Sequence, residues 1–207
     1  MKERFDILVS ETIKPLLKEN KFKKKGLHFY HDTNDLVYLI GLQKSGGNTW
    51  DQIKFYINCG IHSKTIDRII GKETCLKPEQ YECYYVKRIS SVVKSEKDGY
   101  LIDRETDSDV LNVLVSNDLK KVISLFNEVK STSDLIQLMT EENKLYKYEE
   151  LIDYLLIIND KTQAVNYIRE LYRNFGTETR WSVFEGKIMN LLKKHGQEEI
   201  LSNVYKT

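Results

Sequence analysis

The sequence predicts an α+β fold: an N-terminal helix packed on a mainly antiparallel sheet of four to five strands, followed by a helical C-terminal half. Before about residue 105, short runs of aromatic and β-branched residues alternate with clusters typical of turns. From residue 106 onward, apolar residues recur with the 3.6-residue period of helices. Because no linker rich in Pro, Gly or Ser separates the halves, we expect one domain over 1–207, with 1–105 as helix plus sheet and 106–207 as the helical part.

The first element is a predicted helix over about residues 3 to 20, whose apolar residues recur at helical spacing: Phe5, Leu8, Ile13 and Leu17. Four lysines lie within the next five positions, from Lys21 to Lys25, and Gly26 follows them. Cations there favour the negative end of a helix dipole, so we interpret this run as the helix terminus. The alternative is a phosphate-binding patch beside Phe22.

Strands are predicted next, at Leu27 to His31, Leu36 to Gln43, Gln52 to Gly60, Tyr81 to Val93 and Gly99 to Ile102. The second of these is apolar on both faces, as expected for a central strand. In the third, buried-type residues alternate with Lys54, Tyr56 and Asn58. That alternation predicts one face against the core and another that mixes aromatic and polar groups.

A long helix begins after residue 106, with an apolar stripe formed by Leu111, Val115, Leu119, Val122, Phe126 and Val129. Further helices are predicted near 133–142, 145–158, 161–174 and 179–194, with a short one after Gly196. The acidic residues from Asp103 to Asp109 resemble a calcium loop only superficially. Ser108 and Leu114 stand where such a loop needs glycine and glutamate, so these carboxylates are interpreted as a helix start.

Composition excludes several classes of function. The 32 Lys and Arg against 31 Asp and Glu give a net charge of +1, so a nucleic-acid partner is not expected. The three cysteines lack Cys-x-x-Cys spacing, which argues against a disulfide framework and a zinc ribbon. No apolar run approaches the length of a membrane span, and residues 1–25 do not resemble a signal peptide, so we expect a cytoplasmic protein.

No catalytic or metal-ligating constellation is predicted, and no cofactor. His28 and His31 lie three apart on one strand, so they point to opposite faces and cannot share an ion. Cys59 and His62 lack a third group that would orient a nucleophile and its base.

Several short motifs recur in an order that resembles one known family. They are the amphipathic helix running into Phe22–Gly26, the strand ending Leu42–Ser45, the run Phe55–Ile61, the Asp98–Gly99 turn and the helical continuation Val129–Leu138. In this order they resemble the bacterial domain of unknown function 4304, over about residues 1–140. One departure is Tyr100, where that family would have tryptophan after the turn.

The resemblance implies no activity, but it marks Gln43, Ser45 and Asn58 as polar positions where a shared site would lie. Each has a simpler alternative: Gln43 and Asn58 could satisfy backbone groups at strand ends, and Ser45 could start a turn.

The leading functional hypothesis is a non-enzymatic protein-interaction domain, such as an immunity or accessory protein, that binds a protein partner. Its candidate binding residues are Gln43, Ser45, Trp50, Tyr56 and Asn58. The aromatic members would supply the apolar anchor that specific interfaces need. The alternative is a ligand-binding domain or enzyme with a pocket on the sheet, which convergence of these residues in an apolar cavity would favour.

Overall fold

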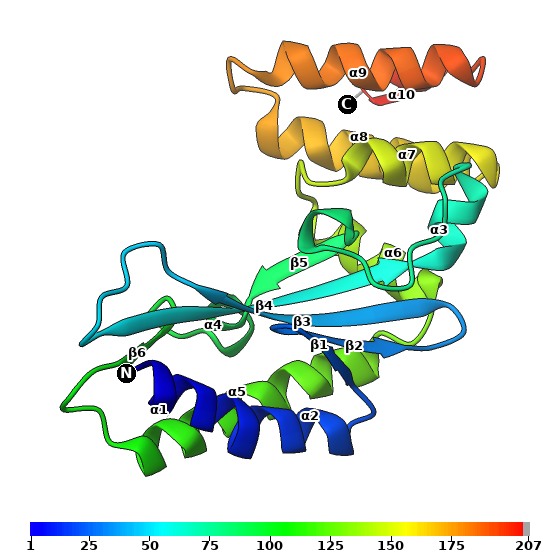
Figure 1. Ribbon diagram of the computed structural model, residues 1–207. Coiled ribbons are helices and arrows are strands. Elements are labelled where there is room, and N and C mark those ends of the chain that lie inside the picture. The colour runs from blue at the N-terminus through cyan, green and yellow to red at the C-terminus, as the bar shows by residue number, and fades with distance from the viewer. Residues whose placement is uncertain (205–207) are drawn as a thin grey trace. The chain divides into compact units, whose positions relative to one another are not determined.

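The computed structural model describes residues 1–204, and its chain divides into two compact units (Figure 1). The first unit is formed by residues 1–63 and 75–131 and contains the sheet. The second is formed by residues 64–74 and 132 onward and is helical. The predicted α+β class is confirmed, while the single-domain organisation of 1–207 stays a prediction.

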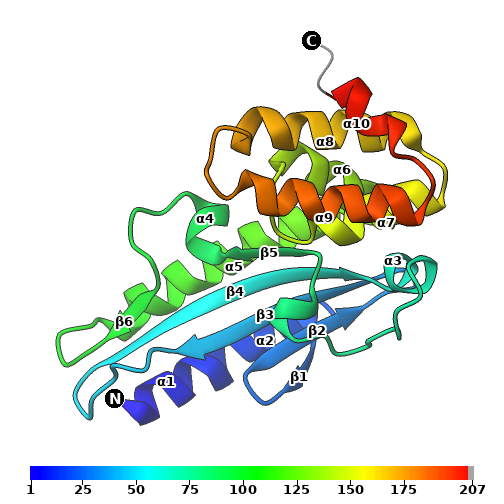
Figure 2. The same ribbon diagram turned by 90° about the horizontal axis from the view of Figure 1, so that it is seen from above.

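The sheet has six strands, and all its pairings are antiparallel. Five follow in the order β1 (Lys23–Lys25), β2 (His28–Asp32), β3 (Leu36–Lys44), β4 (Ile53–Ser63) and β5 (Tyr85–Arg88). The sixth, β6 (Tyr100–Ile102), also pairs with β4. Figure 2 shows β5, the short helix α4 (Ile89–Val93) and β6 following one another along one edge of β4.

One face of the sheet is covered by helices, as Figure 1 shows for α1 (Lys2–Ile7), α2 (Lys14–Glu19) and α5 (Ser108–Glu128). Between α1 and α2 runs a π-helical turn, η1 (Leu8–Ile13). The core beneath is aromatic: the rings of Phe5 and Phe55 lie 5.1 Å apart, and those of Tyr38 and Phe126 stack at 5.0 Å. The Tyr38 hydroxyl donates to the carbonyl of Val129 at 2.7 Å, so its polar tip is satisfied inside the core.

The opposite face is covered in part by residues 75–84, which include the 3₁₀ turn η2 (Gln80–Glu82). Cys83, which follows this turn, packs against the sheet in a small buried cluster with Tyr30, Val37 and Leu39. Gly60 permits this approach, because a Cβ there would lie 2.7 Å from the Cys83 sulfur. Beyond this covered area, the same face carries polar side chains.

Two predicted elements are wrong. The run Tyr81 to Val93 is not one strand, because only Tyr85–Arg88 is extended and Ile89 begins α4. The lysine run is not a helix terminus: the helix ends at Glu19, and Lys21 turns the chain with a φ of 67°. Lys23–Lys25 then form β1, because their backbone pairs with β2 whatever the propensity of the side chains.

The long helix begins as predicted, since the Asp107 side chain accepts hydrogen bonds from the backbone N–H groups of Asp109 and Val110. The acidic residues there therefore start α5.

The second unit contains α3 (Lys64–Ile69), α6 (Thr132–Glu142), α7 (Tyr148–Ile157), α8 (Lys161–Phe175), α9 (Trp181–Lys194) and α10 (Glu199–Val204). Of these, α3 was not predicted from the sequence. Fully buried apolar side chains hold this unit together, among them Leu151, Leu155, Ile168, Leu171 and Ile188. Within residues 1–204, no helix has both the length and the apolar character needed to cross a membrane.

Candidate functional site

The site is built on the face of the sheet opposite α1, α2 and α5. Residues two apart on a strand share a face, so Tyr56 and Asn58 of β4 point to the same side. Gln43 of β3 pairs with Tyr56, and Arg88 of β5 pairs with Asn58, which adds both to that side. We call the surface formed by Gln43, Tyr56, Asn58, Arg88 and Asp98 the polar sheet face.

Asn58 and Gln43 form a side-chain hydrogen bond, with Asn58 Nδ2 donating to Gln43 Oε1 at 2.9 Å. Asn58 is only 4% exposed, whereas Gln43 is exposed. Opposite Asn58 lies Gly41, where a Cβ would be 3.0 Å from the His28 ring, so the glycine leaves room for that imidazole. The amide pair is therefore buried at Asn58 and open to solvent at Gln43.

Tyr56 lies at the centre, with two cations over its ring. The Arg88 guanidinium carbon is 4.0 Å from the ring centroid and Lys54 Nζ is 5.3 Å from it. Cation–π contacts at exposed sites contribute about 0.5–1 kcal/mol each. The ring is half-buried, so one part remains available to a partner.

The turn Asp98–Gly99 completes the polar sheet face. Arg88 Nη1 donates to Asp98 Oδ2 at 2.6 Å, and Ser90 Oγ donates to Asp98 Oδ1 at 3.1 Å. Gly99 has a φ of 87°, and a Cβ there would lie 2.8 Å from the Tyr56 ring and 2.7 Å from the Phe55 carbonyl oxygen. Only glycine fits this backbone and this close approach, so the turn packs against Tyr56 and holds Asp98 at Arg88.

The other two sequence-predicted residues lie in the loop between β3 and β4. Ser45 Oγ accepts from the Gly47 N–H at 3.4 Å, which is the turn-starting role of the simpler alternative. Trp50 is 77% exposed, with the Arg104 guanidinium 4.9 Å from its ring. The structure thus brings Gln43, Tyr56 and Asn58 together and places Ser45 and Trp50 in the hairpin loop.

Sequence reasoning missed Arg88 and Asp98 as members of the site. Both were visible in the motifs, one in a predicted strand and one in the Asp98–Gly99 turn. The strand register, which pairs Asn58 with Arg88, brings Arg88 over Tyr56, and Asp98 joins the site through its hydrogen bond with Arg88.

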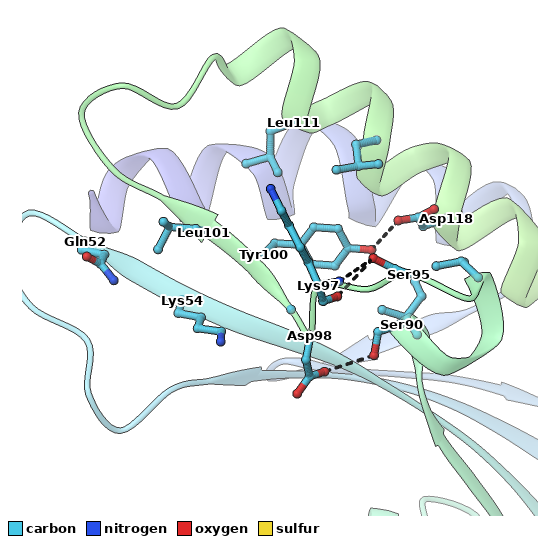
Figure 3. Close-up of a pocket in the computed structure, with 14 residues that line it drawn as sticks. Gln52, Lys54, Ser90, Ser95, Lys97, Asp98, Tyr100, Leu101, Leu111 and Asp118 are labelled. Carbon is cyan, nitrogen blue, oxygen red and sulfur yellow. Dashed lines mark hydrogen bonds between the residues drawn. The ribbon is translucent and has the colours of Figure 1, made fainter.

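A cavity of about 660 Å³ lies next to the turn, bounded by β6, α4 and α5 (Figure 3). Its apolar lining includes Ile89, Val93, Leu111 and Leu114. None of the five sequence-predicted residues lines it.

A buried polar pair in this cavity's wall joins Tyr100 to Asp118, which is 7% exposed. Figure 3 shows the Tyr100 hydroxyl directed at Asp118, to which it donates at 2.8 Å. Burial, together with the Asp118 carboxylate, raises the pKa of the Tyr100 hydroxyl far above its ordinary value. Tyr100 is therefore a neutral donor.

Metal and thiol chemistry have little support among the described residues. Within 1–204, no group of three or more His, Cys, Asp or Glu side chains is placed to hold an ion. His28 contacts Tyr30 while His31 packs on Phe22 and Tyr38, so the prediction that these histidines face opposite ways is confirmed. Burial raises the pKa of the Cys59 thiol well above its ordinary value, which keeps it a poor nucleophile.

Comparison with known proteins identifies a family and nothing more. A family model described as a domain of unknown function (DUF4304) matches residues 13–129, which is more than half of the chain and includes every residue of the polar sheet face. No significant match was found among curated proteins or solved structures. The resemblance carried by the sequence motifs is confirmed, and the chain belongs to the DUF4304 family.

Proposed function

We propose that this protein is a non-enzymatic, cytoplasmic protein-interaction domain that binds its partner through the polar sheet face. The observation that carries the proposal is the grouping of Tyr56, Arg88 and Gln43 on an uncovered part of the sheet within the first unit. Tyrosine and arginine are enriched among the residues that dominate binding energies at protein interfaces. An immunity or accessory protein that covers a site on its partner would need such a surface.

The charge of this surface favours an acidic partner segment. Lys54 and Arg88 lie over Tyr56, and Arg104 lies over Trp50, the exposed aromatic of the neighbouring loop. Of these three cations, only Arg88 has a carboxylate, Asp98, in direct contact within residues 1–204. A carboxylate from a partner would be attracted to Lys54 and to the free edge of the guanidinium, since Arg presents several donors in a planar fork.

The setting supports a binding role over catalysis. Gln43, Tyr56 and Asn58 lie along an open face and do not converge in the cavity beside Tyr100, as a pocket-based site would require. The three cysteines are free thiols, and such a set suits a reducing compartment such as the cytoplasm.

The test is capture with the tagged 207-residue chain, followed by mapping of the contact. We expect one stoichiometric partner that is lost in Tyr56→Ala and in Arg88→Glu and retained in Tyr81→Ala, whose tyrosine is 71% exposed outside the polar sheet face. Hydrogen exchange of the complex should show protection at residues 54–58 and 85–88. A partner that both Tyr56→Ala and Arg88→Glu retain, with protection elsewhere, would contradict the proposal.

The cavity supports a second candidate, a ligand-binding role. The cavity combines apolar residues with the buried Tyr100–Asp118 pair, and small-molecule sites likewise place polar groups within an apolar lining. Native mass spectrometry of the purified chain would test this. A bound small molecule that Val93→Trp displaces, with no protein partner recovered, would favour this candidate over the first.

A further inference from the structure

A second cationic surface lies in the same unit, in a groove between α2 and β1. Four exposed lysines line it: Lys14, Lys18, Lys23 and Lys24. The floor is formed by Phe22 and Phe29, which are 6% and 1% exposed. We call this surface the lysine groove; its volume is about 280 Å³.

The helix and the strand each contribute to the groove for a definite reason. Lys14 and Lys18 are four apart on a helical segment, so they lie on the same side of it, one turn from each other. The chain reverses at Lys21, and β1 then returns alongside with Lys23 and Lys24. Buried Phe22 lies between the two elements in the chain and packs on His31 of β2 and Phe126 of α5.

The charges of the groove are not neutralised within the described part of the chain. None of its four lysines has an ion pair in residues 1–204, and no carboxylate lines the groove. By contrast, Lys72, Lys147, Lys187 and Lys194 each lie within 3.1 Å of a carboxylate oxygen. The protein carries a net charge of only +1, so this is a local concentration of positive charge.

Structural roles explain only part of this arrangement. Lysines on an edge strand such as β1 discourage pairing with another chain. Lys18 lies in the last turn of α2, where a positive charge stabilises the negative end of the helix dipole. Neither role requires Lys14 and Lys24 to face one groove from two different elements. Like charges gathered over an apolar floor repel one another, and a bound anion would relieve that repulsion.

We propose that the lysine groove binds a small ligand through a group of clustered phosphates. Lysine ammonium groups act as point charges toward phosphate oxygens. Lys23 and Lys24 are successive residues of β1 and point to opposite faces, so three ammonium groups, those of Lys14, Lys18 and Lys24, can face a ligand with several negative charges. The groove volume of about 280 Å³ lies just below the range of about 300–1,000 Å³ for small-molecule pockets, so it suits a charged head group and not a whole drug-sized ligand. Nucleic acid fits less well, because its interfaces need extended basic surfaces of about 1,000 Å² or more.

The experiment measures binding of inorganic tripolyphosphate to the full chain by calorimetry at low and high salt. The test variant combines Lys18→Ala with Lys24→Ala. The control combines Lys161→Ala with Lys193→Ala, which removes the same charge from exposed lysines of the second unit. We expect one site, weakened about tenfold or more in the test variant and unchanged in the control. Equal binding by both variants, or none by the wild-type protein, overturns the proposal.

Two further probes assign the source of the phosphates. Adenosine triphosphate represents a soluble nucleotide, and phosphatidylcholine vesicles with a bisphosphorylated phosphatidylinositol represent a lipid head group. Binding of either that depends on Lys18 and Lys24 supports the proposal and names the source. A single-stranded oligonucleotide that binds more tightly than tripolyphosphate, through the same lysines, would replace the small ligand with a polymer and overturn it.

Discussion

The two cationic regions of the first unit differ in what surrounds their charges. On the polar sheet face, Arg88 and Lys54 lie over the Tyr56 ring, and Asp98 holds the guanidinium. In the lysine groove, the cations surround buried phenylalanines and no carboxylate lines the wall. One surface is therefore fixed by its own contacts, whereas the other is incomplete without an anion.

This difference shows that the number of charges does not by itself define a binding surface, because the contacts that hold each charge also matter. An arginine stacked on a ring and bonded to a carboxylate loses little side-chain entropy on binding, because its geometry is already set. Unpaired lysines keep their rotamer freedom and respond chiefly to the charge of a ligand. We therefore expect the polar sheet face to recognise shape and the lysine groove to recognise charge.

The largest expected effect comes from the turn that fixes the polar sheet face. Gly99→Ala adds a Cβ at a φ of 87°, close to the Phe55 carbonyl oxygen and the Tyr56 ring. We expect a loss of about 2–4 kcal/mol in the free energy of unfolding, from backbone strain and overpacking together. Urea denaturation would measure it, with Gly46→Ala as the control because open space surrounds that glycine. A loss no larger than that of the control would mean that the turn does not hold the site.

The next largest effect on stability should come from Arg88. Arg88→Ala removes the contact with Tyr56 and the ion pair with Asp98, so we expect about 1–2 kcal/mol of destabilisation. Arg88→Lys should recover less than half of this, because an ammonium cannot stack and bond in the same geometry. A double-mutant cycle with Tyr56→Leu separates the ring contact from the ion pair. Zero coupling between Arg88 and Tyr56 would show that the stacking contributes nothing.

Much of the fold could be predicted because its signals are local. The alternation within Gln52–Gly60 predicted a strand with one mixed face, and the stripe from Leu111 to Val129 predicted the long helix α5. The failures have non-local causes. Lys23–Lys25 carry no apolar pattern and are extended only because β2 pairs with them, and Ile89 starts a helix although β-branched residues favour strands.

The residues of the site likewise fall into those that local signals predicted and those that only non-local contacts place. Tyr56 and Asn58 could be placed on one face from strand alternation, and Gln43 from the family resemblance. Arg88 and Asp98 could not be placed, because Arg88 reaches Tyr56 only through the pairing of β4 with β5, and Asp98 reaches Arg88 only through the turn at Gly99. The lysine groove was hidden for a related reason: Lys14 joins Lys24 only once the chain reverses at Lys21.

Lys72 and Lys147 of the second unit pair with Glu150, and removing Lys72 should have a smaller effect on the free energy of unfolding, one that depends on pH. The pKa of the Glu150 carboxyl is lowered: burial acts to raise it, but hydrogen bonds and charges from Lys72 and Lys147 outweigh burial. Stability from this group is thus present above the ordinary value of 4.5 and is lost as the pH falls through the lower folded pKa. Lys72→Ala should destabilise by about 0.5 kcal/mol at neutral pH.

The pH series itself is the check on Lys72→Ala. The difference from wild-type protein should shrink as Glu150 becomes protonated, whereas Lys193→Ala, without an ion pair in residues 1–204, should show no such trend. A difference that stays constant down to acid pH would show that Lys72 acts through packing.

The smallest effect should have the opposite sign. Lys14→Ala in the lysine groove removes a charge that repels Lys18 one turn away, so we expect a gain of about 0.2–0.5 kcal/mol in the free energy of unfolding at low salt. The gain should disappear at high salt, where screening suppresses repulsion between exposed charges. Saturating tripolyphosphate should reverse it, because the wild-type groove then gains a counter-ion that the variant binds more weakly.

Thermal and urea unfolding at two salt concentrations would measure all three changes. A loss of stability in Lys14→Ala at low salt would instead place this lysine with Lys72, as a residue whose contacts stabilise the fold.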